Sequence, residues 1–283
     1  MPPRPLPIVD RRPDDGRRHL RADCANCVGL CCVGPAFAAS ADFAIDKPAG
    51  VPCPNLRGDD RCGIHDRLRG SGFPGCSVFD CFGAGQHVTQ GTFEGQSWRG
   101  TPELAASMFA VLPVMRQLHE MLWYLTEAAS LPVPASLLDE VRTARRQTEE
   151  LADGTADELT RLDVAAYRRD VGELLQRVSE QVRARVPKRA RDRRGADLMG
   201  KDLRTTPLRG ASLRGAYLIG ADLRGADLSS TDLLGADLRA ADVRGTDLRT
   251  CLFLTQPQVE AAQGDPGTTI PPALTRPPHW PAG

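Results

Sequence analysis

Cysteine is the residue type in this chain whose number and spacing point to chemistry. Eight of the nine cysteines fall between positions 24 and 81, as C-x2-C-x3-C-C and then C-x8-C-x13-C-x4-C. Several stand beside proline or glycine, which places them on turns, where loops can fix metal ligands. The predicted metal ligands are these eight cysteines and one nearby histidine: Cys24, Cys27, Cys31, Cys32, Cys53, Cys62, His65, Cys76 and Cys81.

Thiols in this number support several kinds of chemistry. In a secreted protein they would form a disulfide framework, whereas in a reducing cytosol the same pattern favours a metal. Eight thiolates and one imidazole would fill two tetrahedral zinc sites and leave one ligand over. They would equally hold an iron–sulfur cluster. We therefore expect zinc as the cofactor and keep iron or an iron–sulfur cluster, redox-active thiols and inert buried cysteines as alternatives.

The cysteine segment also resembles a family of cysteine-cluster domains described as zinc- or iron-chelating and named for a C-x-x-C-x-x-C-C signature. The first cluster here has one extra residue before the cysteine pair, and Cys81 is an addition to the family pattern. The resemblance implies that this segment chelates a metal. The residues that carry it are Cys24, Cys27, Cys31, Cys32, Cys53 in C-P-N-L, Cys62 in C-G-I-H-D, and Cys76.

A strict five-residue repeat, typified by A-D-L-R-G, fills positions 195–254. A period of five fits neither an α-helix nor a flat strand, and a glycine in every fifth position would destabilise a helix. The chain must instead turn a corner in each unit and point the central leucine and the small residue before it inward, with coils stacked about 4.8 Å apart. The central positions are Leu198, Leu203, Leu208, Leu213, Leu218, Leu223, Leu228, Leu233, Leu238, Val243 and Leu248.

This motif resembles the pentapeptide-repeat family, whose fold is a right-handed, four-sided β-helix, so four units should form one coil. Some members imitate DNA and inhibit gyrase, which requires a strongly negative rod. Residues 195–254 carry eight Asp against eight Lys or Arg, which disfavours DNA mimicry. The outward apolar residues usually mark an interface, and we expect them to pack on the helical region or a partner: Met199, Tyr217, Ile219, Leu234, Leu252 and Leu254.

Residues 101–187 have the periodicity of a helical bundle. Thr101 followed by Pro102 predicts a helix start, and Pro113 should kink that helix without ending it. A capping box at Ser136 predicts the second helix, and a third should begin at Asp163. The basic residues that follow, 188–194, are typical of a solvated linker, because no aromatic residues interleave with them to favour nucleic-acid binding.

The two ends of the chain complete the predicted organisation. Phe253 should plug the last coil, Thr255 should start a capping helix, and Trp280 should anchor the proline-rich tail. Residues 1–22 have no apolar signal-peptide core and should be loosely ordered. The expected order is a disordered segment 1–22, a cysteine-rich metal-binding domain 23–100, a helical bundle 101–187, a basic linker 188–194, the repeat β-helix 195–254 and a C-terminal cap and tail 255–283.

The composition of the chain disfavours several classes of function. The formal net charge is zero and aromatic residues make up 5% of the chain, so there is no bulk attraction to nucleic acid or membrane. No stretch is apolar for the length of a membrane-spanning helix, and we expect a cytoplasmic protein. The usual catalytic signatures, including a Ser-His-Asp set, a P-loop and H-E-x-x-H, are absent from the sequence. The sequence therefore favours a non-enzymatic interaction scaffold that carries a metal-binding cysteine domain, with a metal- or thiol-dependent redox protein as the alternative.

Overall fold

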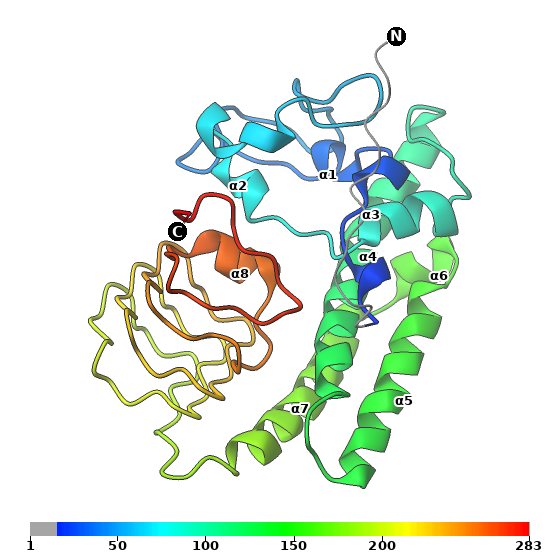
Figure 1. Ribbon diagram of the computed structural model, residues 1–283. Coiled ribbons are helices and arrows are strands. Elements are labelled where there is room, and N and C mark those ends of the chain that lie inside the picture. The colour runs from blue at the N-terminus through cyan, green and yellow to red at the C-terminus, as the bar shows by residue number, and fades with distance from the viewer. Residues whose placement is uncertain (1–15, 283) are drawn as a thin grey trace.

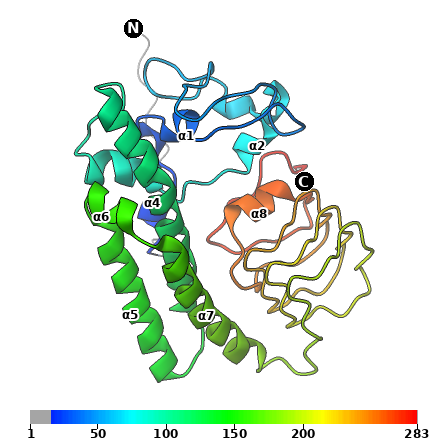
Figure 2. The ribbon, with the colours of Figure 1, turned by 180° about the vertical axis from the view of Figure 1, so that it is seen from behind.

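The computed structural model describes residues 16–282 and contains three connected units (Figure 1). The cysteine-rich segment lies at one end of the long helices, and the repeat region forms a stack of coils beside them. Seen from behind, helix α8 lies at the end of the stack that faces the cysteine-rich segment (Figure 2). The helices are α1 (Leu30–Val33), α2 (Pro74–Ser77), α3 (Ala84–Gln86), α4 (Pro102–Ala128), α5 (Ala135–Ala152), α6 (Ala156–Arg161), α7 (Val164–Arg183) and α8 (Gln256–Ala261), with 3-10 turns at Arg18–Leu20, Cys24–Asn26, His65–Arg67 and Arg69–Ser71 and a π-helical turn at His87–Thr92.

Helix α4 is the central element of the helical bundle and packs against α5, α6 and α7. It begins as predicted, because the Thr101 hydroxyl accepts a hydrogen bond from the Leu104 N–H at 3.2 Å. The helix continues through Pro113. The prediction of a capping box at Ser136 was wrong: α5 starts after Pro134 without a side-chain cap. The capping box lies instead between Thr155 and Glu158, where it starts the unpredicted helix α6.

The repeat region forms coils of twenty residues, as expected from four units per turn. Isolated parallel bridges join residues twenty apart, such as Asp202 with Asp222 and Asp222 with Asp242, and these bridges take the place of extended strands in the described residues. Leu213, Leu218 and Leu223 have no exposed surface. Gly215 takes a corner at φ +61°, a conformation that a side chain would strain.

Backbone pairing in the stack begins before the first predicted unit. The N–H of Ala190 donates to Arg209 O at 2.9 Å, and that of Arg193 donates to Ser212 O at 2.8 Å. Arg183, at the end of α7, is fully buried and donates to Gly210 O at 3.1 Å and to the Asp192 carboxylate at 2.7 Å. Lys188, Arg189, Arg191 and Arg194 are exposed, as expected of a solvated linker, although the backbone of this run already pairs with the first coil.

Helix α8 covers the open end of the stack, as predicted. Its start is a capping box between Thr255 and Gln258. The Gln258 amide then donates to two carbonyls of the coil beneath it, Leu233 O at 2.8 Å and Ala236 O at 2.9 Å. Trp280 is buried, and its indole N–H donates to Ala262 O at 2.9 Å. The backbone groups that a coil stack leaves unpaired at its end thus find partners within the chain.

One face of the stack docks on the bundle. Phe253 is fully buried with its ring edge-on to Tyr124, and its N–H donates to the Glu127 carboxyl. Leu252 and Leu254 are buried in the same contact, but Met199 and Tyr217 remain about half exposed at 48% and 52%. Ile219 and Leu234 are half-buried. For Met199 and Tyr217, which the chain itself leaves exposed, contact with a partner stays a prediction.

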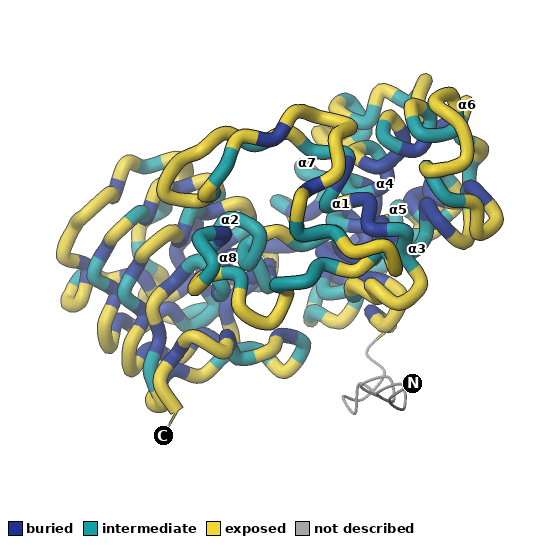
Figure 3. The backbone as a smooth tube through the Cα atoms, turned by 90° about the horizontal axis from the view of Figure 1, so that it is seen from above, coloured by how far each residue is buried: buried dark blue, intermediate teal, exposed yellow. Residues whose placement is uncertain are grey.

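Residues 16–22, predicted to be loose, are packed on the bundle, while the rest of that predicted segment, residues 1–15, lies outside the described residues. Leu20 is fully buried. The Arg17 guanidinium lies 4.7 Å from the Trp123 ring centroid and 3.6 Å from the Glu127 carboxylate. Figure 3 shows that buried backbone is concentrated in the bundle and inside the coils, whereas the cysteine-rich segment is mostly exposed or half-buried. No helix in residues 16–282 is long and apolar enough to span a membrane.

Candidate metal centre

The cysteine-rich segment is held by turns and short helices. Its only β-type pairings among the described residues are two antiparallel bridges, Phe37 with Lys47 and Leu56 with Cys62. Phe37 stacks on Phe43 with ring centroids 4.4 Å apart, and Phe73 meets Phe37 edge-on at 6.3 Å. With so little regular structure, the positions of the cysteines depend on these few loop contacts.

A first group of thiols lies where the 3-10 turn Cys24–Asn26 contacts α3. A Cβ atom built on Gly85 would lie 2.8 Å from Cys27 Sγ and 4.0 Å from Cys81 Sγ, so both sulfurs flank the same glycine. Burial, together with the thiols of Cys31, Cys81 and Cys27, raises the pKa of the Cys24 thiol to about 12. Burial also raises the pKa of Cys81 to about 11, with contributions from Asp80 and Cys31. We call Cys24, Cys27, Cys31 and Cys81 the first group.

A second group of thiols is linked to α1 through the backbone of Cys32. The Cys53 N–H donates to Cys32 O at 2.9 Å, and the Leu56 N–H donates back to Cys53 O at 2.9 Å, next to the bridge that carries Cys62. Burial raises the pKa of Cys76 to about 11, and the thiols of Cys31, Cys53 and Cys62 act in the same direction. We call Cys32, Cys53, Cys62 and Cys76 the second group.

Cys31 connects the two groups. It is adjacent to Cys32 in α1, and the hydrogen bond between their side chains, followed by burial, raises the pKa of Cys31 well above its usual value. The pKa values of Cys24, Cys27, Cys76 and Cys81 are all raised by its thiol. Cys31 therefore lies near thiols of both groups.

The remaining predicted ligand and the ninth cysteine lie elsewhere. His65 is exposed on the 3-10 turn His65–Arg67. Cys251 is buried in the repeat stack and donates to Leu228 O at 3.3 Å. All nine cysteines are free thiols. Within residues 16–282, no three His, Cys, Asp or Glu side chains are arranged closely enough to hold a metal ion. The metal site thus stays a prediction, and binding would require the thiols to lose protons and draw together.

Comparison with known proteins places the chain in a family. The family model for pentapeptide repeats matches eight copies, over residues 194–225, 207–245 and 216–253. The uncharacterized protein YybG of Bacillus subtilis (strain 168) is 54% identical over 272 residues, which cover 94% of this chain and 97% of that protein. The chain belongs to the same family as YybG. Its residues 194–253 are pentapeptide repeats.

One solved structure matches part of this chain. The pentapeptide-repeat protein Rfr23 from the cyanobacterium Cyanothece 51142 is 29% identical over 27% of this chain and 48% of its own, with a TM-score of 0.21. The match to YybG, in contrast, extends over almost the whole chain and so includes the cysteine-rich segment and the bundle.

Two histidines beside the cysteine-rich segment form a pair that the sequence did not indicate. His119 is buried, and one ring nitrogen lies 2.7 Å from Phe82 O while the other lies 2.8 Å from His87 Nδ1. A carbonyl can only accept, so His119 Nδ1 carries the proton and its Nε2 accepts from His87. Burial lowers the pKa of His119 to about 3. The pair joins the segment after Cys81 to α4. We assign the pair a structural role.

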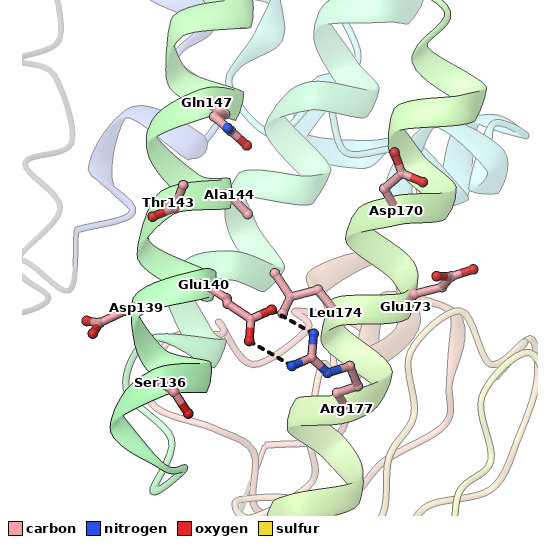
Figure 4. A pocket seen from close by; sticks show the side chains of 10 residues that line it. All are labelled: Ser136, Asp139, Glu140, Thr143, Ala144, Gln147, Asp170, Glu173, Leu174 and Arg177. Atoms are coloured by element: carbon pink, nitrogen blue, oxygen red, sulfur yellow. Dashed lines mark hydrogen bonds and ion pairs between the residues drawn. The ribbon is translucent and has the colours of Figure 1, made fainter.

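A groove of about 610 Å³ lies between α5 and α7 (Figure 4). Arg177 crosses it and forms two hydrogen bonds of 2.7 Å with the Glu140 carboxylate. Asp139, Asp170 and Glu173 line the remainder. The groove holds no histidine or cysteine, so it adds no soft metal ligand to the candidate centre.

Proposed function

We propose that this pentapeptide-repeat protein is an interaction scaffold whose cysteine-rich segment binds zinc. The proposal is supported by eight free thiols in one segment, with Cys27 and Cys81 beside the same glycine and Cys53 hydrogen-bonded to the backbone of Cys32. Four thiolates form a complete tetrahedral set for zinc, so two groups would hold two ions. His65, which lies on the surface, would then be the spare ligand.

The donor chemistry fits a thiophilic metal. Sulfur ligands favour zinc and iron–sulfur clusters over the hard cations that prefer oxygen. Cys24 and Cys31 are exposed residues, yet burial of their thiol groups contributes to the raised pKa of both. Burial disfavours the thiolates that bind a metal, and the positive charge of a bound ion would offset that penalty when it displaces the protons. Structural zinc sites contribute folding free energy in this way, which suits a segment with little regular structure.

The scaffold half of the proposal rests on how the units are joined. Phe82, next to Cys81, is almost fully buried, with its ring 6.0 Å from that of Trp123 on α4. Further along α4, Tyr124 and Glu127 hold Phe253 of the repeat stack. One helix therefore connects the cysteine groups with the repeats. Ordering of the thiols by metal would fix the surface that all three units present to a partner.

The charges of the repeat stack favour an interaction scaffold over DNA mimicry. On one face Asp202, Asp222 and Asp242 are each paired with the arginine two positions later, at 2.6–2.7 Å. These pairs neutralise the carboxylates locally, so the face lacks the continuous negative charge that a DNA mimic needs.

The proposal is tested by metal analysis of the full chain, purified under reducing conditions without added metal. We expect close to two zinc ions per chain and no visible absorption. Cys62→Ser should lower the zinc content, whereas Cys251→Ser, which removes a thiol outside the two groups, should leave it unchanged. If the protein instead contains iron and absorbs visible light, the proposed metal would be iron and not zinc. A chain with no stoichiometric metal would contradict metal binding, and reversible disulfides in that sample would favour a redox protein.

A further inference from the structure

A cavity of about 300 Å³ is lined by residues from all three units. The cysteine-rich segment supplies residues 77–80 of its wall, α4 supplies Trp123, and α8 supplies Gln256, Pro257 and Glu260. Residues 20–22 and Thr275 complete the wall. Its volume is at the lower end of the range for small-molecule sites, which lie preferentially between domains. No cysteine among the described residues belongs to this wall.

Trp123 brings an unpaired hydrogen-bond donor to the cavity wall. Its side chain has an exposed fraction of 3%, and its Nε1–H has no acceptor in the part of the chain that the structure describes. The other two tryptophans of the chain are paired: Trp98 Nε1 donates to Val28 O at 2.8 Å, and Trp280 Nε1 donates to Ala262 O at 2.9 Å. A buried indole N–H usually has a partner. A molecule in the cavity that carries an acceptor would supply one for Trp123.

The aromatic rings of the wall already face cations. Arg17 Cζ lies 4.7 Å and Arg21 Cζ 5.5 Å from the centroid of the Trp123 ring. Arg116 Cζ lies 5.4 Å from the centroid of the Phe79 ring. Guanidinium groups in these positions repel a further positive charge placed on either ring. The cavity therefore disfavours a cationic ligand.

Two carboxylates in the same wall disfavour an anionic ligand. Asp80 Oδ1 accepts from the Phe82 N–H at 2.8 Å, and Glu260 Oε1 accepts from Gln256 Nε2 at 3.1 Å. An ionised carboxylate offers about four acceptor positions, so each of these groups is able to accept from a further N–H. The wall thus combines one donor, two acceptors and apolar surface, and its charges favour a neutral molecule.

We propose that this cavity binds a small neutral amide. The amide oxygen accepts from Trp123 Nε1, an amide N–H donates to the Asp80 or Glu260 carboxylate, and the apolar part of the molecule packs on Phe79 and Val78. Such a ligand contacts all three units at once, so its binding stabilises the junction between the cysteine-rich segment, α4 and α8. This inference is independent of metal binding.

Three aromatic probes of similar size test the cavity: benzamide is neutral, benzoate is an anion and benzylamine is a cation. Each is added to the reduced, isotope-labelled full-length chain, and the indole N–H resonances are followed by NMR. We expect benzamide to shift the Trp123 resonance downfield and to leave those of Trp98 and Trp280 in place, because both of these are already bonded within the chain. Benzoate and benzylamine should shift none of them.

The other outcomes would overturn the proposal. A larger shift of Trp123 with benzoate or benzylamine than with benzamide would contradict a neutral ligand. A comparable shift of all three indole resonances would mean non-specific binding. No shift of Trp123 with any probe would contradict the binding site.

A variant tests the hydrogen bond itself. Trp123→Phe keeps an aromatic ring and removes the N–H, so it should weaken benzamide binding by roughly 2- to 10-fold, the effect of one hydrogen bond. Trp98→Phe is the matched control, because the Trp98 indole lies outside the cavity wall and should not affect the affinity. Both affinities are measured by NMR titration of the probe. If Trp123→Phe folds and binds benzamide as the unaltered protein does, the proposal is wrong. If it does not fold, the indole shifts in the unaltered protein decide.

Discussion

The repeat stack and the cysteine-rich segment show two ways in which one chain reaches a defined structure. In the stack, each coil hydrogen-bonds to the coil twenty residues away, and most inward side chains have no exposed surface. In the cysteine-rich segment, two bridges and a few aromatic contacts hold turns that stay half-exposed. The stack is therefore stabilised by repetition of one contact. The cysteine-rich segment, with a thin core, depends on whatever joins its thiols.

The largest expected effect is in the core of the stack. Leu223 has no exposed surface, and Leu223→Asp would place a carboxylate among apolar side chains without a partner, at a cost of several kcal/mol. We expect the repeat stack to unfold at room temperature, seen as loss of its circular-dichroism signal. A cooperative melt close to that of the unaltered protein would contradict the stacked-coil core.

A somewhat smaller effect is expected at the junction of stack and bundle. Phe253 fills the space between the last coil and Tyr124. Phe253→Ala should lower the free energy of unfolding by about 3–5 kcal/mol, the usual range for such a cavity. Limited proteolysis should then release the repeat stack from the helices. A variant that melts as one unit at the original temperature would show that the stack does not depend on this contact.

Some features of the stack and of the cysteine-rich segment could be predicted from the sequence alone, and others could not. The period of five predicted the twenty-residue coil, the buried leucines and the cap at Thr255, because each depends on neighbouring units. It did not predict the burial of Arg183 or the exposure of Tyr217, because these depend on which face meets the bundle. The sequence did not predict the burial of Lys47, because its neighbours in sequence do not show that three carbonyl oxygens converge on its Nζ. The cysteine spacing identified the thiols, and the approach of Cys27 and Cys81 to the same glycine appeared only with the fold.

The junction should also respond to pH. Burial raises the pKa of Glu127 to about 7, although the Phe253 N–H and the Arg17 guanidinium lower it. The folded protein therefore keeps Glu127 protonated up to a higher pH than the unfolded chain, whose glutamate ionises near 4.5. Stability from this group is full below about pH 4.5 and falls as the pH rises through 7, by up to about 3 kcal/mol.

Glu127→Gln separates this effect from other titrations. The amide oxygen can still accept from the Phe253 N–H but does not ionise. We expect the difference in the free energy of unfolding between pH 5 and pH 8 to shrink in this variant, as measured by urea denaturation at both values. An unchanged difference would mean that Glu127 is not the group that makes the junction sensitive to pH.

The smallest effect is expected on the outer face of the stack. Arg224 pairs with Asp222 at 2.6 Å, but both side chains are open to solvent. Exposed ion pairs contribute little, because water and salt screen them. Arg224→Ala should leave the melting temperature unchanged within error, which makes it the control for Leu223→Asp. A clear drop would show that the arginine rows support the stack.

The most direct test of metal-dependent structure is hydrogen–deuterium exchange of the full chain with and without a zinc chelator. The proposal predicts that chelation releases metal and speeds amide exchange across residues 24–81, while residues 195–254 keep their protection. The repeat stack should be unaffected because its single cysteine, Cys251, is buried away from both groups and bonded to Leu228 O. Unchanged exchange in residues 24–81, with no metal released, would contradict the account that metal holds the cysteine-rich segment together.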